Sequence, residues 1–330
     1  MKRLIGTIIA LFAFLAVAFV SEVNKKNAEK KTPTVGILQT MSHPALDQIH
    51  RGIIQGLKDE GYIEGKNLKI DFQNAQGDQS NLKSMSDRFS QENATVTIGI
   101  ATPAVQSLAN TSGNIPVVMG AVSDPLGAHL VKSLAHPGGK ITGVQDRQPI
   151  ANQLALMQEI LPKAKNIGVI YTSSDDSSAS EYREFRRLAE AKGLKVIPYT
   201  ITSTNDIEQV AQTMVGKVQA VYVPTDNTVA SGIATLLKAT NSAKIPVFPA
   251  ADTMVKSGGL APRCVSQFDM GILTGKMAGQ ILHGKNPATL PVKRVTHYET
   301  VINEKAAREL NITIPNSVIQ AAQKKGRIIK

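Results

Sequence analysis

Hydrophobic and polar residues alternate along this chain in blocks, and one order of blocks recurs five times. A β-branched run ends at a small, polar or proline-containing turn, and a segment with helical spacing follows. In the segment from Asp47 to Glu60, Ile49, Ile53 and Leu57 repeat at the spacing of one helix face, and Gly61 marks its end. Strands that alternate with helices in this way form a parallel sheet covered on both faces, so the pattern predicts an α/β protein. The five β-branched runs are 35–38, 96–100, 117–119, 169–171 and 221–223.

The blocks fall into two series of similar construction, joined near residue 145. The first series has predicted strands at 68–72, 96–100 and 116–120 and predicted helices at 79–90, 103–110 and 126–135. The second begins with a helix at 151–160 and continues with strands at 166–171, 195–200, 219–223 and 245–249, separated by helices at 178–192, 206–215 and 229–240. Two such halves predict two lobes with a ligand cleft between them.

The last third of the chain complicates a division at one point. It contains a predicted short strand at 258–262, a helix at about 268–283 and an extended segment at 295–302. In two-lobed folds with several crossovers, the late helix rejoins the first lobe and the tail rejoins the second, and we adopt that arrangement by analogy. The expected division is a leader at 1–31, a first lobe of 32–145 plus about 266–297, and a second lobe of 146–265 plus about 298–330.

The first residues have the layout of an export signal. Lys2-Arg3 precedes an uncharged run from Leu4 to Val20, and Ser21-Glu22 ends that run. The run is also long enough for a short membrane anchor, and both interpretations remain open. Either one predicts an exported, extracytoplasmic protein, held at the cell surface if the segment is retained and secreted if it is cleaved.

Composition excludes two classes of small scaffold. The single cysteine, Cys264, rules out an internal disulfide framework and a cysteine-based zinc site, and we expect a buried thiol there. Aromatic residues make up 4% of the chain and tryptophan is absent, so the core must be aliphatic. Gly271 and Gly275 have the spacing that lets two helices approach closely.

The net charge of +11 suggests nucleic-acid binding, but its distribution argues against that class. The basic residues concentrate near the ends of the chain, where segments are usually solvated, and between them acids and bases are interspersed. We therefore expect no nucleic-acid partner. The two basic clusters are Lys25, Lys26, Lys30 and Lys31, and Lys324, Lys325, Arg327 and Lys330.

The turns after the strands are the candidate ligand site, because the carboxyl ends of parallel strands line the crevice of such folds. In the first half, Thr102-Pro103-Ala104 places a capping residue before a proline at the first helical position, so the following amides are free to bind an anion. Ser123-Asp124-Pro125 and Ser42-His43-Pro44 repeat this arrangement. A ligand carboxylate is the expected anion, and His43 is either a ligand contact or a structural residue.

In the second half, Thr225-Asp226-Asn227 places a carboxylate where it could meet a ligand ammonium, and Asp252 is a second candidate. Either acid could instead be only a helix cap. Tyr171 is followed by the polar turn Ser173-Ser174, and Phe248 ends another strand. The two rings are either stacking surfaces for an aromatic ligand or core residues.

Motifs of catalysis are absent from the sequence. It contains no P-loop, dinucleotide-binding fingerprint, HExxH, CxxC or GxSxG pattern, and no two histidines have metal-ligand spacing. We therefore predict no catalytic residue, no metal and no cofactor.

The turn sequences resemble those of ABC-transporter substrate-binding proteins of the tryptophan-binding type. The resemblance covers roughly residues 33 to 320 and is clearest at Gly36-Ile37-Leu38-Gln39, Ala101-Thr102-Pro103-Ala104, Val122-Ser123-Asp124-Pro125 and Val223-Pro224-Thr225-Asp226-Asn227-Thr228. It implies a type I periplasmic-binding-protein-like fold and a receptor that delivers a small ligand to a membrane permease powered by a separate ATPase. Two departures are the lack of a lipobox cysteine in the leader and the string Pro262-Arg263-Cys264.

An amino acid, with an aromatic one favoured, fits both the resemblance and the turns, and we expect a monomer. Three other classes were weighed. The effector domain of a sugar-responsive repressor would need an N-terminal helix-turn-helix, where this chain has an apolar leader. A secreted enzyme would need a catalytic constellation that sequence spacing does not reveal. A receptor domain that senses a sugar, nucleoside or peptide remains open.

Overall fold

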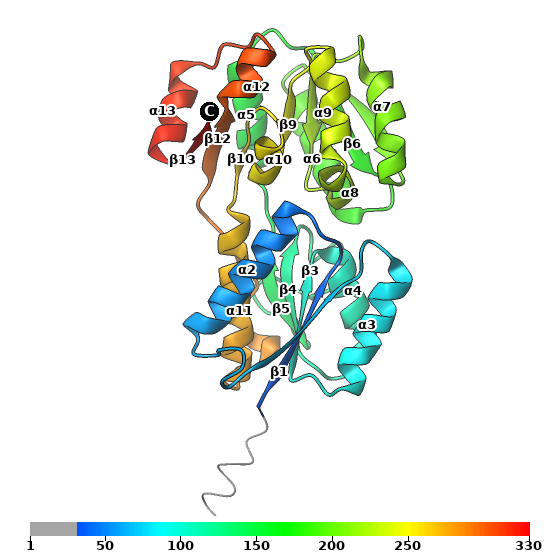
Figure 1. Cartoon of the computed structure of the whole chain (residues 1–330), viewed down its shortest axis with the longest axis vertical. Coiled ribbons are helices and arrows are strands. Elements are labelled where there is room, and N and C mark those ends of the chain that lie inside the picture. Colours follow the sequence, from blue (N-terminus) through cyan, green and yellow to red (C-terminus); the bar gives the residue numbers. More distant parts are fainter. Residues whose placement is uncertain (1–31) are drawn as a thin grey trace, which may run out of the picture.

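Two groups of strands and helices are stacked end to end in the computed structural model, which describes residues 32–330 (Figure 1). The predicted leader at 1–31 lies outside the described residues. The chain passes between the groups after β5, after β10 and after β11. Each group contains a parallel sheet with helices on both faces, which confirms the predicted two-lobed α/β fold.

The first lobe is built on a six-stranded sheet in the order β11-β5-β4-β3-β1-β2, with every pair parallel. Helices α2 and α11 cover one face and α3 and α4 cover the other. Its elements are β1 (Thr34–Gln39), α2 (Pro44–Asp59), β2 (Lys69–Asn74), α3 (Gln79–Gln91), β3 (Val96–Ile100), α4 (Thr102–Thr111), β4 (Val117–Val122), β5 (Ile141–Gln145), α11 (Gln267–Leu282), the 3-10 turn η2 (Pro287–Thr289) and β11 (Lys293–Arg294).

The second lobe has a parallel sheet in the order β7-β6-β8-β9 and a smaller sheet in the order β10-β12-β13. Helices α5 and α6 cover one face of the larger sheet, and α7 and α9 cover the other. Its elements are α5 (Ile150–Ile160), β6 (Asn166–Thr172), α6 (Asp176–Glu190), β7 (Lys195–Ile201), η1 (Thr204–Asp206), α7 (Ile207–Met214), β8 (Ala220–Val223), α8 (Asn227–Ser231), α9 (Ile233–Ser242), β9 (Val247–Pro249), α10 (Asp252–Lys256), β10 (Arg263–Cys264), β12 (Glu299–Asn303), α12 (Glu304–Glu309), α13 (Asn316–Lys324) and β13 (Gly326–Ile329).

Strand pairing shows where the late segments return. Helix α11 packs on α2, and β11 pairs with β5, whereas β12 pairs with β10 and β13. On these pairings we propose that residues 32–145 and 266–297 form the first lobe and residues 146–265 and 298–330 form the second.

Helices α2 and α11 run side by side with backbones in close contact. A Cβ atom added to Gly56 would lie 2.1 Å from the carbonyl oxygen of Ile272, and one added to Gly275 would lie 2.2 Å from that of Ile53. The paired glycines let backbone meet backbone, as expected for Gly271 and Gly275. Both helices begin at the cleft end of the lobe, so this contact fixes the positions of two helix starts at the candidate site (Figure 1).

Two predicted elements are wrong. Residues 126–135 form turns instead of a helix, because the Asp124 carboxylate accepts the backbone N–H of Gly127 and His129 has a φ of 54°, which a helix does not allow. No strand forms at 258–262; the extended pair comes later, at β10.

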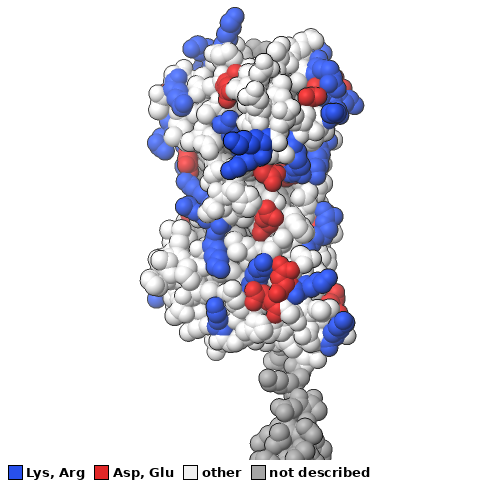
Figure 2. All heavy atoms as spheres, turned by 90° about the vertical axis from the view of Figure 1, so that its left-hand side faces the viewer, with Lys and Arg blue, Asp and Glu red and all other residues white. Residues whose placement is uncertain are grey.

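The C-terminal basic cluster is not a solvated tail. Strand β13 pairs with β12, and the Arg327 guanidinium lies 2.7 Å from Asp252 and 3.3 Å from Glu299. On the face in Figure 2, Lys and Arg side chains are interspersed with Asp and Glu over both lobes. Cys264 is buried as expected, and burial raises the pKa of its thiol. Among residues 32–330, no helix is long and apolar enough to cross a bilayer.

Candidate functional site

A cavity lies between the lobes, at the ends of the parallel strands. Both lobes and the first crossover contribute to its lining, as expected for a fold of this class. The lining residues are His43, Ala45, Leu46, Ile49, Ala101, Thr102, Pro103, Ala121, Ser123, Asp146, Asp175, Ser177, Thr225, Asp226, Asn227, Ala230, Ala251, Met254 and Gln267.

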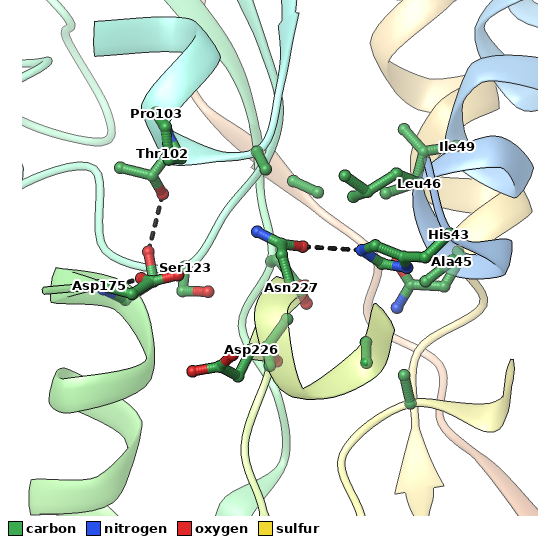
Figure 3. Close-up of a pocket in the computed structure, with 18 of the residues that line it drawn as sticks. His43, Ala45, Leu46, Ile49, Thr102, Pro103, Ser123, Asp175, Asp226 and Asn227 are labelled. Carbon is green, nitrogen blue, oxygen red and sulfur yellow. Dashed lines mark hydrogen bonds between the residues drawn. The ribbon is translucent and has the colours of Figure 1, made fainter. Parts of the chain in front are cut away.

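Hydrogen bonds join the lobes across this cavity. The Thr102 and Ser177 hydroxyl oxygens are 2.7 Å apart, and His43 Nε2 donates to Asn227 Oδ1 at 3.0 Å (Figure 3). The first residue of each pair belongs to the first lobe and the second to the other lobe. These two contacts therefore connect the lobes across the cavity.

The start of α4 forms one end of the cavity. Thr102 is the first helical residue and Pro103 the second, so the free N–H groups of this turn and the partial positive charge of the helix end are available to an anion. Ala101 precedes them with a φ of 73°, which non-glycine residues rarely adopt and which turns the chain sharply from β3 into the helix. The sequence prediction placed the N-cap at Thr102; Ala101 occupies it, and the Thr102 hydroxyl reaches across to Ser177 instead.

An aliphatic wall lies at the opposite side, next to His43. Leu46 and Ile49 point inward from α2, and Met254 contributes from the second lobe (Figure 3). Because Asn227 Oδ1 can only accept a hydrogen bond, the His43 proton sits on Nε2, and burial lowers the pKa of the ring so that it stays neutral. Its Nδ1 is therefore a hydrogen-bond acceptor, buried and without a partner, beside an apolar surface.

Acidic side chains dominate the charge of the cavity, and none of its lining residues is Lys or Arg. The Asp226 carboxylate accepts from the Thr172 N–H (2.6 Å), the Thr172 hydroxyl (2.9 Å) and the Val229 N–H (2.9 Å). Asp175 caps α6 through the N–H groups of Ser177 and Ser178, and burial together with the charge of Asp226 raises its pKa to about 7.

Asp146 differs from these two acids. It follows β5 directly and is 1% exposed; its Oδ1 accepts from Gln148 Nε2 at 2.5 Å, and its Oδ2 has no partner. Burial raises its pKa to about 6, against the effect of that hydrogen bond. Glu181, on α6, is 5% exposed, and burial and then the charge of Asp146 raise its pKa to about 8. Among the described residues, no group of His, Cys, Asp and Glu is arranged to hold a metal ion.

Seven of the fifteen predicted site residues line the cavity. They are His43, Thr102, Pro103, Ser123, Thr225, Asp226 and Asn227. The other eight, which do not line it, are Ser42, Ala104, Asp124, Tyr171, Ser173, Ser174, Phe248 and Asp252.

Of the two aromatic residues predicted as either stacking surfaces or core residues, Phe248 is in the core of the second lobe and Tyr171, partly buried, packs against that core. The Tyr171 ring stacks on Tyr182 at a centroid distance of 4.7 Å, and Phe248 is 3% exposed. Side chains alternate across a sheet, so residues within a strand point into a helix-covered face and not out of its end. Neither ring lines the cavity, and the wall next to His43 is aliphatic.

The remaining predicted residues have structural contacts elsewhere. Ser42 bonds to Asp47, Ala104 is in the core of the first lobe, and Asp124 holds its own turn. Ser173 and Ser174 are exposed, and the Ser173 hydroxyl donates to the Ile201 carbonyl. Asp252 pairs with Arg327.

Sequence reasoning missed four polar lining residues, which are Asp146, Asp175, Ser177 and Gln267. Asp146 carried a usable signal, since it follows the strand-like run 141–145 in the same way that the five chosen turns follow theirs. Gln267 has no comparable signal. It lies one residue after the Ser266 N-cap of α11, and its Nε2 is buried without a partner.

Known proteins are similar to this chain both in sequence and in fold. A family model described as ABC transporter substrate binding protein matches residues 34–325. A protein of Clostridioides difficile named tyrosine-binding protein is 36% identical over 292 residues, which are 88% of this chain and 85% of that protein. The chain therefore belongs to the ABC transporter substrate binding protein family.

Solved structures support the same assignment. An ABC domain from Streptococcus pneumoniae in complex with L-Trp is 44% identical, with a TM-score of 0.87 over 91% of this chain and 100% of that one. A ligand-free, open structure of a substrate binding protein with adhesive properties from Clostridium difficile is 34% identical, with a TM-score of 0.70 over 90% and 99% of the two chains. The fold is the type I periplasmic-binding-protein fold, and these relatives are binding proteins.

Proposed function

We propose that this protein captures an aromatic amino acid in the cavity between its lobes and delivers it to an ABC permease powered by a separate ATPase. The observation that supports this most strongly is the cavity itself, which combines a helix start for a carboxylate, unpaired acidic oxygen for an ammonium and an aliphatic wall for a side chain. Relatives that bind tryptophan or tyrosine agree with it.

In this proposal the ligand carboxylate lies against the amides at the start of α4, with the Thr102 and Ser123 hydroxyls beside it. The ring packs on Leu46 and Ile49 from α2. His43 Nδ1 then accepts the polar hydrogen of the ring, the indole N–H of tryptophan or the phenol O–H of tyrosine.

Lobe closure is the proposed means of capture. The structure has a higher TM-score with the tryptophan complex than with the ligand-free, open relative, 0.87 against 0.70. The interlobe bonds from Thr102 and His43 would stabilise the closed form once the ligand fills the cavity. We further propose that the protein acts outside the cytoplasm as a monomer, exported or anchored through residues 1–31.

Titration calorimetry of residues 32–330 with each of the twenty amino acids tests this proposal. We expect tight binding of one or a few, with tryptophan and tyrosine ahead of phenylalanine because only they offer a hydrogen to His43 Nδ1. Absence of heat with all twenty, together with binding of a sugar or a peptide, would refute the ligand assignment.

A further inference from the structure

The cavity acids are not equivalent, and their hydrogen bonds separate them. Asp226 uses both oxygens on Thr172 and Val229, so it ties the end of β6 to the start of α8. Asp175 uses Oδ1 to cap α6. Both carboxylates therefore stabilise local structure within the second lobe.

Asp146 has an unpaired oxygen in a buried position. Its Oδ2 is enclosed and has no donor. A buried carboxylate that lacks a full set of donors is costly, and a cation placed against it removes that cost. No Lys or Arg lines the cavity, and His43 is neutral, so the chain itself supplies no such cation there.

The position of Asp146 in the chain adds a second argument. It is the first residue after β5, on the crossover into the second lobe, and its N–H donates to the Val122 carbonyl at 2.9 Å. A group bonded to its carboxylate is therefore in contact with a segment that must rotate when the lobes move. Gln267, which follows the crossover into α11, also presents an unpaired buried atom to the same cavity.

We propose that Asp146, and not Asp226, binds the ammonium group of the ligand and thereby sets the preference for an α-amino acid over a ligand without the amine. This inference rests on the proposed function. It assigns the specificity of the site to a residue on the connection between the lobes, where binding of the cation completes the hydrogen bonds of a hinge segment.

Asp146→Asn removes the charge and keeps the size of the side chain. The probes are L-tryptophan and indole-3-propionate, which lacks the amine, with L-tyrosine and 3-(4-hydroxyphenyl)propionate as the second pair. In the unchanged protein we expect the amino acid to bind about 100-fold more tightly than its analogue, as for a buried charge pair with one partner removed. In Asp146→Asn that preference should fall to less than about fivefold, because the charge that attracts the ammonium group is gone.

Asp252→Asn is the matched control, because Asp252 is equally buried, also has one unpaired oxygen and lies outside the cavity. It should keep the full preference for the amino acid even if its thermal midpoint falls, since it loses its pairing with Arg327. The ratio between two ligands does not depend on the fraction of folded protein, so a folding defect in either variant does not imitate the effect.

Three outcomes overturn the assignment. If Asp146→Asn keeps the 100-fold preference, Asp146 does not bind the ammonium group, and the proposed function is unaffected. A loss of preference in Asp175→Asn alone moves the site to the start of α6. If the unchanged protein binds none of the amino acids, both the proposed function and this assignment are wrong.

Discussion

The affinity for an amino acid should fall about tenfold between pH 7 and pH 5, because burial raises the pKa of Asp146 to about 6 in the empty cavity. An ammonium group favours the charged carboxylate, so the complex holds Asp146 ionised at both pH values. Below pH 6 the empty protein must lose a proton to bind the ligand. Affinity therefore rises with pH up to about 6 to 7 and then levels off.

The stability of the unliganded protein should change in the opposite direction. Burial raises the pKa of Asp146, Asp175 and Glu181 to about 6, 7 and 8. An acid whose pKa is higher in the folded state holds its proton more tightly when folded, so its contribution is fully present below the unfolded pKa. It is lost as pH rises through the folded value. Stability without ligand should decline between about pH 4 and pH 8, within the range set by these pKa values.

Calorimetry at pH 5, 6, 7 and 8, with thermal unfolding of the empty and the saturated protein, measures both effects. The rise in the thermal unfolding midpoint that ligand produces should be larger at pH 8 than at pH 5. In Asp146→Asn the weak remaining affinity should not vary between pH 5 and pH 7. An affinity that is flat over this range in the unchanged protein would contradict the role of Asp146.

Gly275→Ala and Gly56→Ala should each destabilise the protein by about 3 kcal/mol, the upper part of the range for overpacking a core. The new methyl group would lie within 2.2 Å of a backbone carbonyl oxygen of the opposite helix, and backbone yields less than a side chain. Separating α2 from α11 would also move His43, Leu46 and Gln267, so ligand affinity should fall together with stability.

Gly139→Ala is the control for this pair. A Cβ at Gly139 meets no atom within 4 Å, and its backbone does not require a positive φ, so the stability should stay within about 0.5 kcal/mol of the parent. Denaturant unfolding measures all three variants. Equal stability of Gly275→Ala and the parent would mean that α2 and α11 do not need backbone contact.

The fold was predictable because it depends on local signals that repeat. Strand runs such as 96–100 and amphipathic helices such as α2 keep their periodicity when buried against a sheet. The exception at 126–135 shows the limit of that reasoning. Apolar spacing predicted a helix there, but a single side-chain bond from Asp124 and a left-handed residue at His129 turned the chain instead.

The site was predictable only in part, because a strand end locates a turn without specifying which side chains point inward. Thr102 and Ser123 were found from capping chemistry, whereas the Tyr171 ring lies within its strand and stacks on Tyr182 instead of lining the cavity. The sequence left Asp226 as either a ligand carboxylate or a helix cap, and in the fold it caps α8 with both of its oxygens bonded. The unpaired oxygen of Asp146 results from how the folded chain packs, so the spacing of residues in the sequence could not predict it.

A crystal structure of residues 32–330 grown with the tightest-binding amino acid tests the central claim most directly. We predict one ligand between closed lobes, with its carboxylate at the start of α4, its ring against Leu46 and Ile49, and its ammonium on Asp146. Lobes that stay apart at saturating ligand, or a ligand bound outside this cavity, would contradict it.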